Sequence, residues 1–152
     1  MELQYGSKQF VLEQIKDERK LKLWSQVLFK NYNFPLAFSD DWFDLHRSCS
    51  FTNDFGWNHF ALYEEDNSKS NIIGAGSIFL GKEDSQSSFA NLCVAPDYRG
   101  KGLGTYITAK LLLILSARNY RTVTLYAAKD ALAIYTKLQF TQQWKNTFFV
   151  RT

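Results

Sequence analysis

The pattern of apolar and polar positions along the chain predicts a mixture of helices and strands. Apolar residues recur at helical spacing over residues 17–29 and 102–118, and shorter helices are expected over 39–48 and 130–138. Runs with strand character lie at 7–13, 57–63, 72–80, 88–94 and 122–126. A terminal hairpin is expected to pair 140–144 with 147–150.

The connections between these elements indicate how the strands pair. The polar segment 64–71 predicts a hairpin between its two flanking strands, and 88–94 extends the same meander until Pro96 ends it. Strand 88–94, the glycine-rich turn after it, the helix and strand 122–126 make a βαβ unit with two parallel strands. We therefore expect an α+β, three-layer fold whose central sheet is mixed and mostly antiparallel, with one parallel pair.

Length and composition are those of one globular domain covering 1–152. The chain has 152 residues, of which 45% are hydrophobic and two are prolines, so it can bury a continuous core. No apolar block of a signal peptide occurs at the start, and the longest apolar run, 111–115, is far below the ~18 residues of a membrane span. Two cysteines are too few for a disulfide framework. A cytoplasmic location with no membrane partner is the simplest expectation.

Charge is distributed unevenly along the chain. Residues 99–152 contain nine Lys or Arg and one acid, a net charge of +8, whereas residues 1–98 contain nine and fourteen, a net charge of −5. A basic segment favours a polyanionic partner, either nucleic acid or a phosphate-rich cofactor. The aromatic residues that could stack on bases concentrate in the acidic part. We therefore expect no nucleic acid partner.

The segment 94–105, Val-Ala-Pro-Asp-Tyr-Arg-Gly-Lys-Gly-Leu-Gly-Thr, combines three glycines and two cations in front of the long helix. The glycines let backbone N–H groups turn toward one point, and the helix N-terminus adds unpaired N–H groups and its positive dipole end. Arg99 and Lys101 supply positive charge. A P-loop would require Ser or Thr directly after Lys101, where Gly102 stands. The loop therefore predicts a pyrophosphate site.

Two motifs resemble those of the GNAT superfamily of acyl-CoA N-acyltransferases. Residues 99–104, Arg-Gly-Lys-Gly-Leu-Gly, look like the family's Arg/Gln-x-x-Gly-x-Gly/Ala loop, with Val-Ala-Pro before it at the usual spacing. Residues 134–140, Ile-Tyr-Thr-Lys-Leu-Gln-Phe, resemble the ending Leu-Tyr-Glu-Lys-Leu-Gly-Phe, although Gln139 replaces the glycine. Ala128 stands where many members have a side chain that touches the cofactor. The resemblance implies a GNAT-like N-acetyltransferase fold.

The same resemblance implies an activity. The enzyme would transfer the acetyl group of acetyl-CoA to a primary amine by direct attack in a ternary complex, without a metal. The acceptor would be a small-molecule amine or a polypeptide amine, and a homodimer is common in the family. Two alternatives stay open: a catalytically degenerate domain that binds acyl-CoA as a sensor, and, less favoured, a nucleic-acid-binding module.

The resemblance further implies which residues form the site. Backbone groups of Leu92, Cys93 and Val94 would pair with the amide-bearing arm of the cofactor, and an N–H near Val94 would stabilise the oxyanion. Tyr135 stands where many members have a general acid, because a phenol with a pKa near ~10 suits protonation of the leaving thiolate. A tyrosine that only packs is the alternative. The cofactor loop would comprise Arg99, Gly100, Lys101, Gly102, Leu103, Gly104 and Thr105.

The general base cannot be assigned from the sequence. Strand 88–94 has no acid where some family members carry a glutamate. Water relayed through Asn91 or a backbone carbonyl stays open, as do Glu64, Asp84 and His59.

Two further features have competing interpretations. Cys93 lies near the expected acyl group, but without a partnering His it is expected to be a small buried hydrophobe, and His46 with Cys49 is too few ligands for a metal site. Residues 31–60 hold nine aromatics and four acids, which predict either a rim that attracts a cationic amine or core aromatics beside solvated acids. The acids are Asp40, Asp41, Asp44 and Asp54.

Overall fold

A computed structural model describes residues 3–5, 8–49, 51, 55–65, 71–82 and 86–146, with the backbone alone for 3–5 and 8. The strands in this part of the chain are β1 (Leu3–Tyr5), β2 (Lys8–Gln14), β3 (Gly56–Glu64), β4 (Ile72–Leu80), β5 (Gln86–Val94) and β6 (Thr122–Leu125). The α-helices are α1 (Glu18–Asn31), α2 (Ser39–Cys49), α3 (Leu103–Ala117) and α4 (Leu132–Lys137). Short 3-10 helices lie at Leu36–Phe38, Pro96–Tyr98 and Lys129–Ala131.

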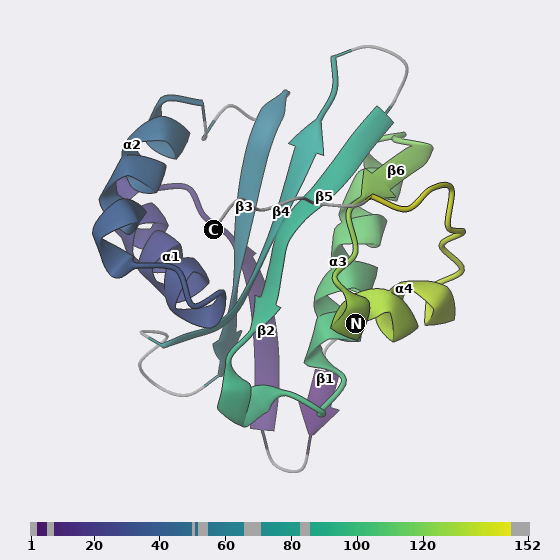
Figure 1. Ribbon diagram of the computed structural model, residues 1–152, viewed down its shortest axis with the longest axis horizontal. Helices are drawn as coiled ribbons and strands as arrows, with labels where there is room; N and C mark the ends of the chain where they lie inside the picture. Colours follow the sequence, from purple (N-terminus) through teal and green to yellow (C-terminus); the bar gives the residue numbers. More distant parts are fainter. Residues whose placement is uncertain are drawn as a thin grey trace.

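The six strands form one sheet in the order β1-β2-β3-β4-β5-β6. Neighbouring strands are antiparallel except for β5 and β6, which run parallel. Figure 1 shows α1 and α2 on one side of the sheet and α3 and α4 on the other. The three-layer α+β fold with one parallel pair, expected from the sequence, is confirmed.

Each face of the sheet has its own core, because alternate residues of a strand point to opposite faces. Between the sheet and α3, Phe60, Leu62 and Ile73 pack with Ile107 and Leu111. On the other face, Ala61, Tyr63 and Ala75 pack with α1 residues such as Leu21 and Trp24. β3 and β4 therefore read as nearly continuous buried runs, since both of their faces are covered.

Helix α1 is anchored at its start and along its buried face. Asp17 is the N-cap residue, and its side chain accepts a hydrogen bond from the Lys20 backbone N–H at 2.8 Å. Trp24 has no exposed surface, and its indole N–H donates to the Phe60 carbonyl at 3.0 Å. A buried indole needs such a partner, so this bond fixes α1 across β3.

The structure differs from the predicted elements at two places. The strand β1 was not expected, because its three residues carry too short a pattern to be distinguished from a turn. The predicted strand over 140–144 is wrong: residues 140–146 form no ladder, and Gln143 instead donates to the Thr141 hydroxyl at 2.9 Å. Its expected partner, 147–150, lies outside the described residues.

Candidate functional site

The two parallel strands, β5 and β6, separate where the cofactor is expected to bind. β5 pairs with β6 from Gln86↔Thr122 to Phe89↔Leu125, and the pairing stops there although β5 continues to Val94. One edge of residues 90–94 is therefore not paired with β6. Such an edge is able to take an added extended chain with amide groups.

A β-bulge lies at the point where the strands separate. The β4–β5 register shifts between Ala75 and Ser77, so Asn91 and Leu92 both stand opposite Gly76. Asn91 has a φ of 57°, a left-handed conformation that asparagine tolerates better than most residues. The bulge turns the strand, and the backbone of 92–94 thereby leaves the parallel pair.

The open edge exposes defined backbone groups. The Ala95 N–H donates to the Ile73 carbonyl at 2.8 Å, so by the alternation of a ladder the N–H and C=O groups of Val94 point away from β4, and the Leu92 carbonyl bonds Tyr32 and not β4. Two side chains already bond their carbonyls. The Arg99 Nε donates to Val94 O at 2.9 Å, and the Tyr32 hydroxyl donates to Leu92 O at 3.0 Å.

The loop that follows presents backbone amides at the start of α3. Gly100 and Gly102 have φ values of 74° and 76°, and a Cβ added to either would meet nothing within 4 Å. Gly102 is the N-cap residue of α3 and supplies no side-chain cap, so the first N–H groups of the helix are not capped by the residue before them. Lys101 lies against this turn, with its ammonium 2.9 Å from the Asp97 carbonyl.

Gly104 serves a different purpose from the other two glycines. It is the second residue of α3, and an added Cβ would lie 2.8 Å from Ile134 Cδ1 of α4. Its small size therefore allows α4 to approach α3, whereas the expectation was that all three glycines free the backbone for a ligand. The close packing of the two helices brings Tyr135 of α4, the candidate acid, next to the unpaired edge of β5.

Two phenols and a thiol lie together at this edge. Tyr135 on α4 is 7% exposed, and burial raises the pKa of its phenol. Burial also raises the pKa of Tyr32 to about 12, with further contributions from nearby Cys93 and Tyr135. Tyr32 as a whole keeps 41% of its surface exposed. Tyr32 could not be identified from the sequence, because 60 positions separate it from Leu92, whose carbonyl it bonds.

Cys93 has the character of a protonated thiol. Burial raises its pKa to about 12, although a hydrogen bond to the Ala75 backbone and the charge of Arg99 act in the opposite direction. Its side chain packs with the core under α1. Because the thiolate is the nucleophilic form, this environment opposes a covalent cysteine intermediate.

The candidate bases Glu64, Asp84 and His59 and the candidate water relay Asn91 lie in different places. Glu64 accepts a hydrogen bond from the Tyr98 hydroxyl at 2.6 Å, at the end of β3 away from the bulge. Asp84 lies outside the described residues. His59 is 1% exposed and buried in the sheet. Asn91 is half-buried and lies at the bulge itself.

Two of the four acids in the segment 31–60 form ion pairs at the surface. Asp40 pairs with Lys22 at 3.3 Å, and Asp44 pairs with Arg47 at 3.1 Å. Asp54 is outside the described residues. The aromatics divide: Trp42 and Phe43 pack against the core under α1, whereas Phe34 and Phe38 are exposed. The exposed ones lie in the connection that carries Tyr32.

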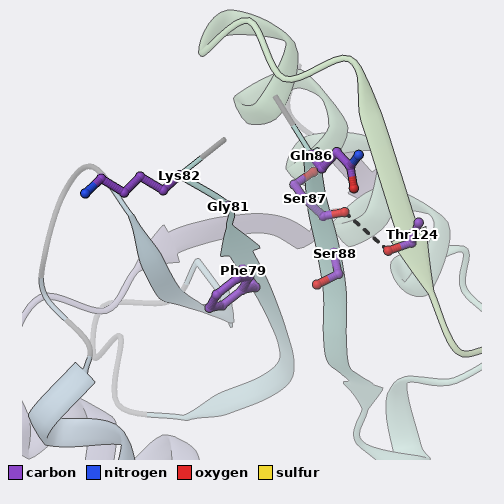
Figure 2. A pocket seen from close by; sticks show the side chains of 7 residues that line it. All are labelled: Phe79, Gly81, Lys82, Gln86, Ser87, Ser88 and Thr124. Carbon is purple, nitrogen blue, oxygen red and sulfur yellow. Dashed lines mark hydrogen bonds between the residues drawn. The ribbon is translucent and has the colours of Figure 1, made fainter. Parts of the chain in front are cut away.

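An open pocket of about 410 Å³ lies on the sheet beside the parallel pair (Figure 2). Phe79, Ser88 and Thr124 line it from three strands. Their strand neighbours Ile78, Phe89 and Leu125 belong to the core under α3, so the pocket lies on the opposite face of the sheet. A second hollow of about 570 Å³ lies between α1 and α2 and is lined in part by Lys22 and Lys30.

No group of three or more His, Cys, Asp or Glu side chains that could hold a metal ion occurs among the described residues. Helices long and apolar enough to span a bilayer are likewise absent from that part of the chain.

A family model for the acetyltransferase (GNAT) domain matches residues 56–142, which is more than half of the chain. The match begins at β3 and includes the bulge, the loop and α4, so it covers every backbone feature of the site described above. The chain belongs to the GNAT family of acetyltransferases.

Solved structures with the same fold include three acetyltransferases. One from Trypanosoma brucei has a TM-score of 0.70 and 19% identity, covering 93% of this chain and 99% of that one. A predicted acetyltransferase from Clostridium acetobutylicum, solved with acetyl-CoA, has a TM-score of 0.72 and 17% identity over 91% and 96%. Glucosamine-6-phosphate N-acetyltransferase from Arabidopsis thaliana has a TM-score of 0.68 and 16% identity over 93% and 97%. At these identities the likeness concerns the fold.

Proposed function

We propose that the chain is a single-domain N-acetyltransferase, covering 1–152, that transfers the acetyl group of acetyl-CoA to a primary amine. The observation that carries this proposal is the uncapped start of α3 beside an edge of β5 that β6 leaves unpaired. The first feature suits a pyrophosphate and the second an extended arm with amide groups. Coenzyme A contains both in that order. The free thiols of Cys49 and Cys93 fit a reducing cytoplasm.

In this proposal, the loop from Arg99 to Thr105 holds the pyrophosphate, with Arg99 and Lys101 supplying positive charge. The N–H groups of Leu92 and Val94 face the gap and receive the arm and the thioester oxygen. Their carbonyls are bonded by Tyr32 and Arg99, so the N–H groups are the backbone donors left for the substrate. A donor aimed at the developing oxyanion is the interaction that stabilises acyl transfer.

The chemical step needs one acid and one neutral amine. The amine nitrogen attacks the thioester carbon, the C–N bond forms, and the C–S bond breaks with release of the coenzyme A thiolate. Tyr135 then gives its phenolic proton to that thiolate, the attacking nitrogen loses its extra proton to water, and the Tyr135 phenolate regains a proton from water. The raised pKa of Tyr135 keeps the phenol protonated before the reaction.

The acceptor approaches from the face of the sheet that α3 does not cover. The pocket in Figure 2 offers the ring of Phe79 and the hydroxyls of Ser88 and Thr124 on that face. Exposed Phe34 and Phe38 border the same side from the connection after α1. An acceptor with apolar and hydroxyl-bearing parts fits this lining better than a purely cationic one. No polyanionic nucleic acid is required by this arrangement.

The experiment is calorimetry with acetyl-CoA followed by free-thiol release across an amine panel. The panel contains glucosamine 6-phosphate, sisomicin, spermidine, L-lysine and a tetrapeptide with a free N-terminus. Binding with thiol release is expected. Binding without release from any panel amine would favour the acyl-CoA sensor, and RNA binding without acetyl-CoA binding would favour the nucleic-acid module.

A further inference from the structure

A buried chain of four polar side chains crosses the sheet and ends at the bulge. His46 Nδ1 lies 2.9 Å from His59 Nε2, and His59 Nδ1 lies 2.8 Å from Ser77 Oγ. Asn91 Nδ2 donates to the same Ser77 oxygen at 3.1 Å. The members come from α2, β3, β4 and β5, so no local sequence pattern contains them.

The hydrogen bonds of this chain run in one direction. Because Ser77 Oγ accepts from Asn91, its own hydroxyl hydrogen is free to donate to His59 Nδ1. His59 then carries its hydrogen on Nε2 and donates to His46 Nδ1. In this arrangement each of the three hydrogen bonds has one donor and one acceptor, and both imidazoles are neutral.

The surroundings of the two histidines oppose charge on either ring. His46, His59 and Ser77 are 3%, 1% and 0% exposed. The rings of Trp24, Trp42 and Trp57 pack around the imidazoles, with centroids 4.4 to 6.2 Å away. Burial, and then the neighbouring His46, lower the pKa of His59 to about 3. The chain is therefore an arrangement of fixed neutral dipoles and not a store for a proton.

This chain of hydrogen bonds also cannot carry a proton away from an amine at the bulge. A carboxamide does not exchange protons readily, and Ser77 has no exposed surface through which water would bypass Asn91. What the chain does fix is the orientation of the Asn91 amide. With Nδ2 turned inward to Ser77, Oδ1 is the acceptor atom of the amide, and no protein partner for it occurs among the described residues.

We propose that Asn91 Oδ1 accepts an N–H from the acceptor amine, and that Ser77, His59 and His46 are positioning residues that hold this oxygen toward it. Asn91 precedes Leu92, whose edge receives the thioester in the proposed function, on which this inference rests. The side chain is half-buried at the bulge, where the amine must meet the acyl carbon. An amide oxygen orients a neutral amine without holding it as an ammonium, as a carboxylate would. This explains why the strand works without an acid.

The test compares two variants with a matched control, using the panel amine on which the wild type turns over fastest. Asn91→Gly removes the amide and tolerates the left-handed φ, so the bulge keeps its conformation. Ser77→Ala removes the hydroxyl that joins Asn91 to His59 and keeps the Asn91 side chain. Ser25→Ala is the control, because Ser25 is also 0% exposed and bonds only within α1, to Leu21 O.

We expect kcat/KM for the amine to fall about 10-fold or more in Asn91→Gly and about 3- to 10-fold in Ser77→Ala. The acetyl-CoA Kd should stay within about 2-fold in both, and Ser25→Ala should match the wild type. Side-chain nitrogen NMR should report His59 as the Nε2–H tautomer in the wild type, and Ser77→Ala should change that signal.

Unchanged amine kcat/KM in Asn91→Gly would overturn the inference, as would an Nδ1–H tautomer of His59 in the wild type. Loss of acetyl-CoA affinity equal to the loss in kcat/KM would assign these residues to the fold of β5 instead. If the wild type itself transfers to no amine, the proposed function fails first and this inference falls with it. Transfer by both wild type and Asn91→Gly at equal rates removes this inference alone.

Discussion

The two faces of the sheet differ in how their functional groups are assembled. On the α3 side, the proposed phosphate-binding loop is one contiguous run from Arg99 to Thr105 at the start of a helix. On the α1 and α2 side, contacts join residues far apart: Tyr32 with Leu92, and His46 with His59 and Ser77. In the proposed function, local backbone geometry binds the shared donor coenzyme A, whereas the proposed acceptor side is built from side chains that only the fold brings together.

The largest expected effect tests the role proposed for Tyr135 as the general acid. Tyr135→Phe should lower kcat about 100-fold or more, because the thiolate would leave without a proton donor. The acetyl-CoA Kd should hardly change. Thiol release and calorimetry give the two values.

Tyr106→Phe is the control for Tyr135, since Tyr106 is also 7% exposed and its hydroxyl bonds the Phe10 carbonyl at 3.1 Å. It should lose about 1 kcal/mol of stability and keep its kcat. Equal kcat in Tyr135→Phe and the wild type would reduce Tyr135 to a packing residue.

The histidines of the acceptor side make stability depend on pH. The pKa of His59 is lowered from 6.5 to about 3, so between these values the unfolded chain binds a proton that the folded chain refuses. The free energy of unfolding should therefore decrease by about 2 kcal/mol when the pH is lowered from 7 to 5.

Urea denaturation of wild type and His59→Gln at several pH values from 5 to 7 measures this slope. The variant should have the lower stability at pH 7 and a flatter pH dependence. Parallel curves for the two proteins would mean that His59 is not kept neutral by burial.

A substitution at a loop glycine tests the proposed cofactor loop. Gly102→Ala places a side chain at φ 76°, at a strain of about 1–2 kcal/mol. Because relief of that strain moves the amides, acetyl-CoA binding should weaken about 10-fold or more. Gly56→Ala carries the same strain at φ 84° on β3. By calorimetry the Gly56 variant should bind acetyl-CoA as the wild type does, and equal losses in both variants would contradict the role of the loop.

The smallest expected effect concerns the contact between the two sides at Tyr32. Tyr32→Phe removes the bond to the Leu92 carbonyl, and kcat/KM should fall about 3- to 10-fold, the worth of one hydrogen bond. Tyr106→Phe removes a comparable bond to the Phe10 carbonyl at 3.1 Å, away from the gap. A loss of the same size in both variants would show that Tyr32 acts only through stability.

The contiguous half of the site could be predicted from sequence. The strand, the turn, the helix and the expected cofactor loop lie in one run of about thirty residues, where periodicity and glycine placement carry the information. The parallel pair followed from the βαβ rule. The different purpose of Gly104 could not be foreseen, because it depends on contact with Ile134 thirty residues later.

The other half could not be predicted, since its determinants are tertiary. Asn91 has the sequence context of an ordinary strand residue, and only the register shift opposite Gly76 makes it a bulge. His46 and His59 read as isolated histidines until the sheet and α2 bring their rings to 2.9 Å. The predicted strand over 140–144 is wrong for a related reason, because alternation in a short polar segment does not require a partner strand.

The most direct test of the central claim is an amide NMR titration of the wild type with acetyl-CoA. The backbone N–H signals from Gly100 to Thr105 should shift, together with those of Leu92 and Val94. If these signals stay unmoved at millimolar acetyl-CoA, or if the shifts gather around Lys22 and Lys30 instead, the proposed site is contradicted.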